Sequence, residues 1–322
     1  MITGSNGFVG SYLAAFLTQK GVAVYGTIHR GIERISHVGD QITTFECEIL
    51  DKERVEKIVR QVEPNLVFHL AAQSRVAPSW QDPEETFKVN VLGTLYLLDA
   101  VRNAAVDPVV VVVCSAAEYG YCNKEELPVD EDGELKPSDP YAVSKVAQDL
   151  LSHLYWQNYG LRVIRVRPFN ITGPGITGDA CSDFASRIVE IERGQREALN
   201  VGDLDGVRDI TDVRDAIEAL WLAAEKGTPG EVYNLCSGTG YRIGDLLDKL
   251  VTLSGHTVRV LQDQAKTGGS DSRIQIGNNN RLCRLGWRPC IPIEKTLSDT
   301  LDYWRRKPTD SQSQSTILLT DS

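Results

Sequence analysis

The sequence has no uninterrupted apolar run near the roughly 18 residues needed to span a bilayer. Positive charge is also scarce, because 34 Lys and Arg face 44 Asp and Glu, a formal net charge of −10. Nucleic-acid binders need clustered Lys and Arg for the phosphates, so this balance argues against that class. The first residues, MITGSNGFVG, are too polar and glycine-rich for the apolar core of a secretory leader. These absences predict a soluble, cytoplasmic protein that binds neither membrane nor nucleic acid.

Cysteine and histidine occur without the spacings that make disulfide frameworks or metal sites. The seven cysteines are scattered and odd in number, none forms a CxxC pair, and the five histidines include no HExxH. We therefore expect no metal and no disulfide framework, and interpret the thiols as small buried or half-buried side chains. They are Cys47, Cys114, Cys122, Cys181, Cys236, Cys283 and Cys290.

Short apolar, β-branched runs alternate with longer amphipathic stretches through the first two-thirds of the chain. Unbroken apolar strands are typical of a parallel sheet covered by helices on both faces. The alternation predicts an α/β fold with a doubly wound parallel sheet of the Rossmann type. The predicted strands are Gly21–Ile28, Leu66–Ala71, Val109–Ser115, Arg162–Arg167 and Glu231–Cys236, and the predicted helices are Tyr12–Gln19, Asp51–Gln61, Pro83–Asn103, Tyr141–Tyr159 and Val213–Ala224.

The character of the chain changes after Asn170, where glycines and prolines gather. We expect a dinucleotide-binding domain of residues 1–170 plus about 207–236, interleaved with a smaller α/β domain for the substrate. The smaller domain takes about 171–206 and 237–306, and the Ser-, Thr- and Gln-rich residues 307–322 are predicted to be a disordered tail. Only Met1 and Ile2 precede Thr3, fewer than the about five residues of a usual strand, so we expect a few native N-terminal residues to be missing.

A glycine-rich turn opens the predicted fold. Residues 3–10 read TGSNGFVG, which contains GxxGxxG and runs directly into a helical segment. Glycines permit a tight turn and close approach of the backbone to a pyrophosphate, and the helix N-terminus offers free N–H groups and a positive dipole end. At the start of a βαβ pattern this turn predicts a dinucleotide phosphate site.

The end of the second predicted strand indicates which dinucleotide is bound. A cofactor with a free ribose 2′-OH is usually held there by Asp or Glu, but the sequence reads YGTIHR over 25–30. A carboxylate would repel a 2′-phosphate, whereas the guanidinium of Arg30 would bind it through charge-assisted hydrogen bonds. NADP(H) is therefore favoured over NAD(H); the alternative is that Arg30 lies on a solvated loop.

Tyr141 and Lys145 form a YxxxK at the start of a predicted helix, and the i, i+4 spacing places both on one face. An ammonium near a phenol lowers a pKa that is normally near 10, so the pair could exchange a proton near neutral pH. Ser115 ends a predicted strand on the carboxyl side, where doubly wound folds bind ligands. We interpret Ser115, Tyr141 and Lys145 as candidate catalytic residues; in isolation, YxxxK would be read as solvated surface.

Taken together, these motifs resemble the extended short-chain dehydrogenase/reductases that act on nucleotide sugars, over roughly residues 1–306. Within that group, the segments VGDL (201–204), VRDITDVRD (207–215) and YNLCSG (233–238) are most similar to GDP-4-keto-6-deoxy-mannose reductases and the neighbouring GDP-mannose 4,6-dehydratases. The motifs that carry the broader resemblance are TGxxGFxG, the HLAA strand end at 69–72, Asn90, Ser115, YxxxK and RPFN at 167–170.

The resemblance implies a nicotinamide cofactor, a nucleotide-sugar substrate and a homodimer. The helical stretches Pro83–Asn103 and Tyr141–Tyr159 resemble those that pair in the family's four-helix dimer interface, although sequence alone also allows them to pack only on the sheet. The implied cofactor site comprises Thr3, Gly4, Gly7, Phe8, Val9, Gly10, Thr27, His29, Arg30, Glu48, Ile49, Leu70, Ala71, Ala72, Tyr141, Lys145 and Pro168. The implied substrate site comprises Gln73, Ser115, Tyr141, Asn170 and Arg208.

In these relatives, Asn170 and Arg208 would contact the phosphates of the sugar nucleotide. The structural alternatives are a turn residue for Asn170 and an ion pair with Asp209 or Asp212 for Arg208. A second-domain arginine that usually grips the diphosphate is replaced by Gly268, with Lys266 or Arg273 as possible substitutes. Lysine lacks the bidentate fork of arginine, so this departure leaves the substrate open.

The segment SAAEYG at 115–120 separates reductases from dehydratases. The dehydratases it resembles carry Thr at the position of Ser115 and a catalytic Glu two residues before the tyrosine, where this sequence has Ala117. A methyl group cannot act as acid or base. Glu118 is the nearest carboxylate, and in an extended chain it would point to the opposite side, which disfavours dehydration. The alternative is a kink in the loop that brings Glu118 to the catalytic position.

We therefore predict NADPH-dependent reduction of the C4 ketone of a nucleotide-linked 4-keto-6-deoxy-hexose, such as GDP-4-dehydro-6-deoxy-D-mannose to GDP-D-rhamnose. Tyr141 would protonate the alkoxide, Lys145 would lower the tyrosine pKa and hold the nicotinamide ribose, and Ser115 would bind the sugar oxygen. The alternatives are a GDP-mannose 4,6-dehydratase, a UDP-sugar 4-epimerase and, from another class, a non-catalytic dinucleotide-sensing protein.

Overall fold

The computed structural model describes residues 1–29, 31–32, 34–262 and 274–307. The chain divides into two compact units. Of the described residues, 1–171, 209–240 and 274–290 form the larger unit, and 172–208, 241–262 and 291–307 form the smaller one. The chain passes between the units within three short strands, β7 (Asn170–Thr172), β9 (Val207–Asp212) and β11 (Gly240–Arg242).

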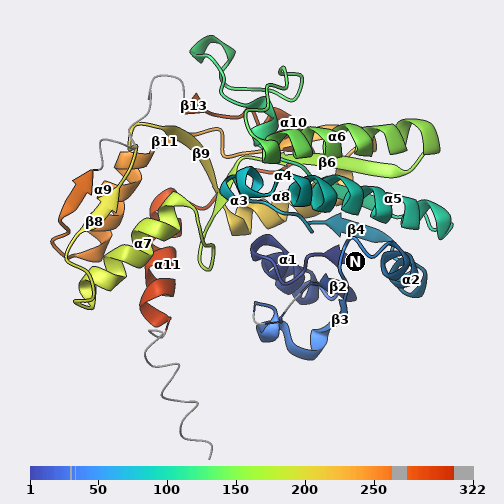
Figure 1. Ribbon diagram of the computed structural model, residues 1–322, viewed down its shortest axis with the longest axis horizontal. Coiled ribbons are helices and arrows are strands. Elements are labelled where there is room, and N and C mark those ends of the chain that lie inside the picture. Colours follow the sequence, from blue (N-terminus) through green and yellow to red (C-terminus); the bar gives the residue numbers. More distant parts are fainter. Residues whose placement is uncertain (30, 33, 263–273, 308–322) are drawn as a thin grey trace, which may run out of the picture. The chain divides into compact units, whose positions relative to one another are not determined.

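A seven-stranded parallel sheet organises the larger unit, with the strand order β10-β6-β5-β4-β1-β2-β3 (Figure 1). The order reverses between β1 and β4, so the carboxyl ends of these two strands form the ligand-binding crevice of a doubly wound fold. The predicted fold class is confirmed. The strands are β1 (Ile2–Thr3), β2 (Val24–Ile28), β3 (Ile42–Glu46), β4 (Leu66–His69), β5 (Val109–Val113), β6 (Arg162–Pro168) and β10 (Val232–Leu235).

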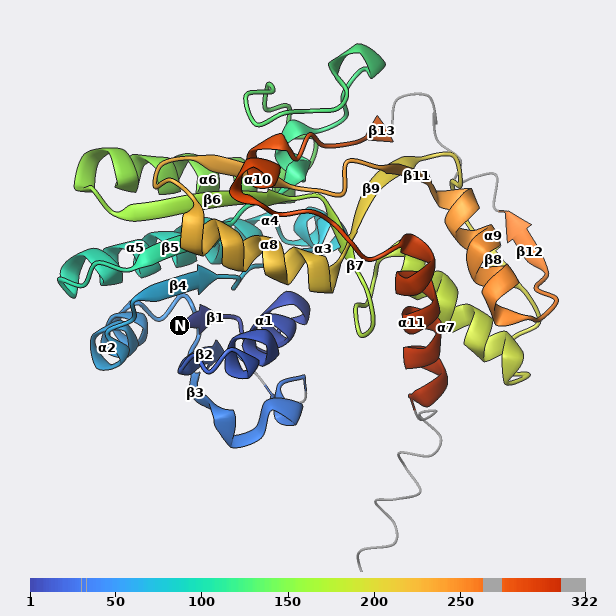
Figure 2. The same ribbon diagram turned by 180° about the vertical axis from the view of Figure 1, so that it is seen from behind.

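Helices cover both faces of this sheet: α1 and α8 lie on one face and α2, α5 and α6 on the other (Figures 1 and 2). Within the described residues, no helix is both long and apolar enough to cross a membrane. The helices of this unit are α1 (Phe8–Gln19), α2 (Lys52–Val62), α3 (Val76–Gln81), α4 (Pro83–Phe87), α5 (Gly93–Asn103), α6 (Pro140–Tyr159), α8 (Val213–Lys226) and α10 (Asn280–Leu285). Shorter turns are η1 (Ser36–Gln41), the π-helical η2 (Lys88–Leu92), η3 (Ala116–Tyr119) and η4 (Lys124–Glu126).

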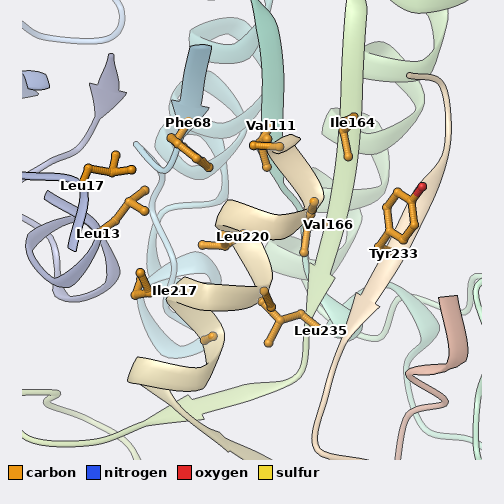
Figure 3. Packing of buried hydrophobic residues seen from close by; sticks show 14 of the residues in the cluster. Leu13, Leu17, Phe68, Val111, Ile164, Val166, Ile217, Leu220, Tyr233 and Leu235 are labelled. Atoms are coloured by element: carbon orange, nitrogen blue, oxygen red, sulfur yellow. The ribbon is translucent and has the colours of Figure 1, made fainter. Parts of the chain in front are cut away.

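Two apolar layers hold the sheet between the helices. Val111 of β5 faces Leu220 of α8, whereas its neighbours Val110 and Val112 belong to the opposite layer with α2 and α5 (Figure 3). Successive side chains of a strand point to opposite faces, so a run of valines in β5 serves both layers. This packing fixes the carboxyl end of β5, where Ser115 follows.

The smaller unit packs three helices against one another and carries a two-stranded parallel ribbon. Its helices are α7 (Ala180–Glu192), α9 (Ile243–Ser254) and α11 (Ile293–Arg306), and its ribbon pairs β8 (Leu199–Val201) with β12 (Val260–Gln262). Trp304 donates its indole N–H to Ser182 at 3.0 Å, which ties α11 to α7.

The division differs from the predicted domains in one segment. Residues 274–290, expected in the smaller domain, belong to the larger unit and contain β13 (Ile274–Gln275) and α10. Trp287 lies in the apolar core of the larger unit and donates to the Asp215 carbonyl of α8 at 3.0 Å. Because Trp287 is buried in the core of the larger unit, the segment folds with that unit and not with the smaller domain. The predicted tail over 308–322 lies outside the described residues.

Candidate active site

The glycine turn connects β1 to α1 with very little room for side chains. Gly4 has φ +71°, and a Cβ there would lie 3.0 Å from backbone atoms of Ala71. A Cβ on Gly10 would lie 2.3 Å from the carbonyl oxygen of Gly4. No side chain caps α1 at Gly7, so the N–H groups of its first turn, at Phe8 and Val9, are available to an anion. The turn therefore has the geometry of a phosphate cradle.

Thr3 and His69 meet at the ends of β1 and β4, where the strand order reverses. The Thr3 hydroxyl lies 2.8 Å from His69 Nδ1 and accepts hydrogen bonds from the N–H groups of Leu70 and Ala71. His69 Nε2 lies 2.9 Å from the hydroxyl of Thr94. Burial, aided by the charge of Lys145, lowers the pKa of His69 to about 3, so the ring is neutral. These hydrogen bonds fix the end of β4, from which the chain continues through Leu70 and Ala71 to Ala72.

The ends of β2 and β3 bring together residues expected to contact the cofactor ribose and adenine. Thr27 is buried, with its hydroxyl facing the Gly4 N–H at 3.4 Å. His29 forms an ion pair with Glu48, which follows β3. Both residues are in the cofactor site implied by the resemblance, but the cofactor argument weighed only the end of the second strand and not this carboxylate after the third. Arg30 lies outside the described residues, and Ile49 is buried in the core.

Ser115 is the N-cap of η3 and is fixed at both of its polar ends. Its hydroxyl accepts from the Ala117 N–H at 3.1 Å, and its own N–H donates to Glu118 Oε1 at 2.9 Å, which forms a capping box. The chain after Ser115 is therefore a tight turn and not the extended segment expected from the sequence. Because of this turn, the Glu118 side chain reaches back to the serine backbone.

Tyr141 and Lys145 lie in the first turns of α6, which Asp139 caps and Pro140 opens. Lys145 Nζ lies 6.0 Å from the centre of the Tyr141 ring and donates to the Val113 carbonyl at 2.9 Å and Gln148 Oε1 at 2.7 Å. Burial raises the pKa of Tyr141, opposed in part by its side-chain hydrogen bond with Ser115. Burial lowers the pKa of Lys145.

The structure thus brings the three candidate catalytic side chains together. One predicted detail is wrong: the net effect on the Tyr141 phenol is a raised pKa, because desolvation exceeds the influence of its neighbours. A phenol with a raised pKa keeps its proton at neutral pH, which suits a proton donor.

Gln73 and Asn90 join the loop after β4 to α6. Asn90, in the π-turn η2, accepts from the Gln73 N–H at 2.8 Å and donates to the Gln73 carbonyl and to Ser144 Oγ. The side chain of Gln73, expected at the substrate, donates to Thr86 Oγ1 at 3.0 Å and accepts from the Arg75 N–H. Both amides hold the loop beside the catalytic helix.

The three remaining candidates are Pro168 in β6, Asn170 in β7 and Arg208 in β9. Pro168 ends that strand in register with Leu235 of β10. Asn170 is exposed and donates to the Asp209 carbonyl at 3.0 Å. Arg208 belongs to the smaller unit and donates to the adjacent Val207 carbonyl at 3.0 Å.

The two acidic residues weighed as ion-pair partners for Arg208 each have other partners as well. The Asp209 carboxylate accepts from Ser237, Gly238 and Gly277, and Asp212 pairs with Arg214 at 2.7 Å. The candidates Lys266, Gly268 and Arg273 lie outside the described residues.

Residues 1–300 match the family model described as GDP-mannose 4,6 dehydratase. The GDP-6-deoxy-D-mannose reductase of Pseudomonas aeruginosa is 31% identical over 95% of this chain and 97% of that protein. The chain belongs to this family. It is a nucleotide-sugar enzyme of the extended short-chain dehydrogenase/reductase class, as the motifs indicated.

Two solved structures resemble the chain over nearly its whole length. The structure of RMD from Pseudomonas aeruginosa complexed with NADPH has a TM-score of 0.82 and 29% identity, and the match covers 94% of this chain and 98% of that one. A UDP-glucose 4-epimerase from Thermotoga maritima, solved with UDP-glucose, has a TM-score of 0.86 and 28% identity over 95% of this chain and 98% of that one. The chain therefore shares its fold with both RMD and an epimerase, and only the residues of the site can distinguish such activities.

At the position expected to carry the dehydratase glutamate, this family member has Ala117, which is half-buried. The adjacent Glu118 is fully buried: its Oε1 accepts from the Ser115 N–H, and its Oε2 lies 3.1 Å from Arg167 Nε. The described part of the site therefore offers Ser115, Tyr141 and Lys145 as the groups that could exchange protons or hydrogen bonds with a sugar.

Behind the catalytic residues lies a buried charged cluster that sequence reasoning missed. Asp149 pairs with Arg165 at 2.6 Å and with Arg167 Nε at 3.0 Å, and Arg167 also donates to the Tyr119 hydroxyl at 2.9 Å. The ligand atoms of Cys114, Glu118 and Asp149 lie within 4.8 Å of one another, but the two guanidinium groups already supply the positive charge that a metal would bring. Two arginines at i and i+2 on a core strand were the available signal, because they must share one face.

Proposed function

We propose that this enzyme uses NADPH to reduce the C4 ketone of a GDP-linked 4-keto-6-deoxy-hexose. The lining of the site carries the proposal: Ser115 lies beside Tyr141, and Ala117 stands where the dehydratases are expected to carry a glutamate. The similarity to the Pseudomonas GDP-6-deoxy-D-mannose reductase supports the same reaction. The product for GDP-4-dehydro-6-deoxy-D-mannose would be GDP-D-rhamnose.

The glycine turn fits a dinucleotide, because a Cβ at Gly4 or Gly10 would fill the space that the backbone needs to approach a pyrophosphate. Gly7, Phe8 and Val9 would hold the phosphates, and Lys145 would hold the nicotinamide ribose. When bound, NADPH supplies the hydride. Preference for NADP(H) is supported by the NADPH complex of the Pseudomonas structure, while NAD(H) is the cofactor of some epimerase neighbours.

The protein contributes the proton and the orientation of the ketone. Tyr141, protonated at neutral pH, donates its proton to the alkoxide oxygen that forms at C4. Ser115, which lies beside Tyr141, would donate its hydroxyl hydrogen to the same oxygen, which aligns the ketone with the phenol. Lys145, buried beside them, favours the developing phenolate electrostatically and is supported by Gln148.

The decisive experiment mixes purified protein with NADPH and GDP-4-dehydro-6-deoxy-D-mannose and follows absorbance at 340 nm. Loss of absorbance with formation of a GDP-6-deoxy-hexose supports the reductase. Conversion of GDP-mannose to its 4-keto derivative would establish the dehydratase instead, and interconversion of UDP-glucose and UDP-galactose the epimerase. Binding of NADPH without turnover of any of these substrates would favour a sensing role.

We also infer that the enzyme is a homodimer that pairs through α5 and α6. Val143, Leu150 and Leu154 recur along α6 and are exposed, Leu150 by 57%, and Leu92 before α5 is exposed as well. Apolar side chains in such a row are typical of a helix that packs on a partner. Light scattering should give about twice the chain mass of 35.6 kDa, and Leu150→Lys with Leu154→Lys should give a monomer.

We also propose that the enzyme is cytoplasmic. All seven cysteines are free thiols, although Cys122, Cys283 and Cys290 are not fully buried. Unpaired thiols with access to solvent are typical of a reducing compartment. Fractionation of cells that express the tagged chain tests this placement directly.

A further inference from the structure

Glu118, a member of the buried charged cluster, contacts the backbone of a candidate catalytic residue. Its Oε1 accepts from the Ser115 N–H at 2.9 Å, and its side chain is 0% exposed. The hydroxyl of Ser115 in turn accepts from the Ala117 N–H. Two hydrogen bonds thus fix the serine that faces Tyr141, one from its N–H to the Glu118 carboxyl group and one to its hydroxyl from the Ala117 N–H.

Charged and titratable groups surround the carboxyl group. Arg167 of β6 lies 3.1 Å from Oε2, Asp149 and Lys145 approach from α6, and Cys114 from the end of β5. Burial, reinforced by the negative charge of Asp149 and opposed by Arg167, raises the pKa of Glu118 to about 8. Near neutral pH the group is therefore mostly a neutral acid, whose carbonyl oxygen still accepts from the serine N–H.

We propose that Glu118 is a positioning residue that holds Ser115 against Tyr141 through its hydrogen bond to the serine backbone, and that it neither donates nor removes a proton during the reaction. The inference rests on the proposed function of Ser115 and extends it to a residue outside the reacting groups. Because Glu118 is buried below the serine, it would act by geometry alone.

Two variants of equal length isolate this hydrogen bond. Glu118→Gln keeps a carbonyl acceptor and resembles the neutral acid, and its amide N–H can face Asp149. Glu118→Met fills the same space without an acceptor. Since a displaced catalytic group costs up to about 100-fold, we expect Glu118→Met to lower kcat about 30-fold and Glu118→Gln to lower it less than about 3-fold, with KM for NADPH unchanged in both. Equal loss in both variants would overturn the proposal, because the charge or acid–base chemistry would then be responsible.

A double-mutant cycle tests whether the effect passes through the serine. In a Ser115→Ala background the turn is still formed, but the hydroxyl that Glu118 positions is gone. Glu118→Met should then lower kcat by less than about 3-fold further, because the two changes remove one shared function. Additive losses would overturn the proposal. Asp149→Asn, which disturbs the same cluster without touching Ser115, should be additive with Ser115→Ala.

A measurement without substrate separates this inference from the proposed function. In protein labelled with 15N-serine, the Ser115 amide resonance should shift with pH between about 5 and 10 in the wild type, because the hydrogen bond reports the ionisation of Glu118. The shift should vanish in Glu118→Gln and persist in Asp149→Asn. A Ser115 resonance that shifts with pH in Glu118→Gln as it does in the wild type would overturn the contact. Failure of the wild type to reduce any 4-keto sugar nucleotide would refute the proposed function while leaving this result intact.

Discussion

The two halves of the site in the larger unit are built from different parts of the chain. The phosphate cradle at β1 and α1 is made of backbone: its glycines admit no Cβ, and no side chain caps the helix. The catalytic half at β5 and α6 is made of side chains, with Ser115, Tyr141 and Lys145 each held by hydrogen bonds to buried neighbours. Binding in the first half therefore depends on space, and chemistry in the second depends on proton positions.

This contrast has consequences for substitution. In the cradle, adding one methyl group should cost cofactor affinity while leaving the chemistry of bound cofactor intact. In the catalytic half, removing one hydroxyl should cost turnover while leaving cofactor affinity intact. The two halves can therefore be separated by measuring KM for NADPH and kcat on the same variants.

The largest effect is expected from Tyr141→Phe. The variant keeps the ring and loses the proton that completes ketone reduction, so kcat should fall by about 1,000-fold. The dissociation constant for NADPH, measured by fluorescence titration, should stay within about 2-fold of the wild type, because the glycine cradle is untouched. A variant that kept more than a tenth of wild-type kcat would show that another group delivers the proton.

Gly10→Ala should give the complementary result. Its Cβ would lie 2.3 Å from the Gly4 carbonyl oxygen and 2.9 Å from Ser5 Cα, so the turn must open. We expect KM for NADPH to rise about 100-fold, the equivalent of about 2.7 kcal/mol, with kcat at saturation nearly unchanged. Gly21→Ala is the matched control, because Gly21 follows the same helix at φ +73° with nothing within 4 Å of its Cβ. The control should leave KM for NADPH unaltered.

The backbone half was the easier one to predict from sequence. Glycine spacing reports a steric requirement directly, so the turn, the helix after it and the sheet that supports them follow from local patterns. The strand β3 was missed because its residues ITTFE are half-exposed and do not form an apolar run. With that strand unknown, the approach of Glu48 to His29 at the neighbouring strand ends could not be foreseen.

For the catalytic half, the sequence predicted which residues take part but not how they are arranged. The YxxxK spacing and the serine after β5 identified the three residues. The turn at Ala116–Tyr119 was not predicted, although SAAE at 115–118 has the Ser-x-x-Glu spacing of a capping box. The predicted direction of the Tyr141 pKa shift was wrong, because the sequence motif shows the nearby ammonium group but not the burial of the phenol. The contacts of Glu118 with Arg167, and of Arg167 with Asp149, join residues far apart in the chain and form only in the folded core.

His69 ends β4, between the phosphate cradle and the catalytic residues. Its folded pKa of about 3 lies below the usual 6.5, so the unfolded chain binds more protons between these values and stability is lost as pH falls through that range. From pH 7.5 to 5.0 this group should remove about 2 kcal/mol from the free energy of unfolding.

His69→Gln should therefore be less sensitive to acid than the wild type, whatever its stability at pH 7.5. Urea unfolding at pH 7.5 and 5.0 measures both proteins. Glu118 provides a contrast of opposite sign: its raised pKa means that its contribution is present below about 4.5 and is lost as pH rises toward about 8. An equal pH dependence in His69→Gln and the wild type would mean that His69 is not held neutral in the fold.

The smallest effect is expected from Ser144→Ala, which tests how far the catalytic half extends into its support. Ser144 Oγ donates to the Tyr141 carbonyl at 2.7 Å and accepts from Asn90 Nδ2 at 2.8 Å. Asn90 keeps its hydrogen bonds to Gln73 when the hydroxyl is removed, so the loop stays anchored. We expect a loss of about 1 kcal/mol in the free energy of unfolding, which is the usual worth of a buried hydrogen bond. Because α6 remains capped by Asp139, kcat should change by less than about 3-fold, and a larger loss would show that the position of Tyr141 depends on the π-turn beside it.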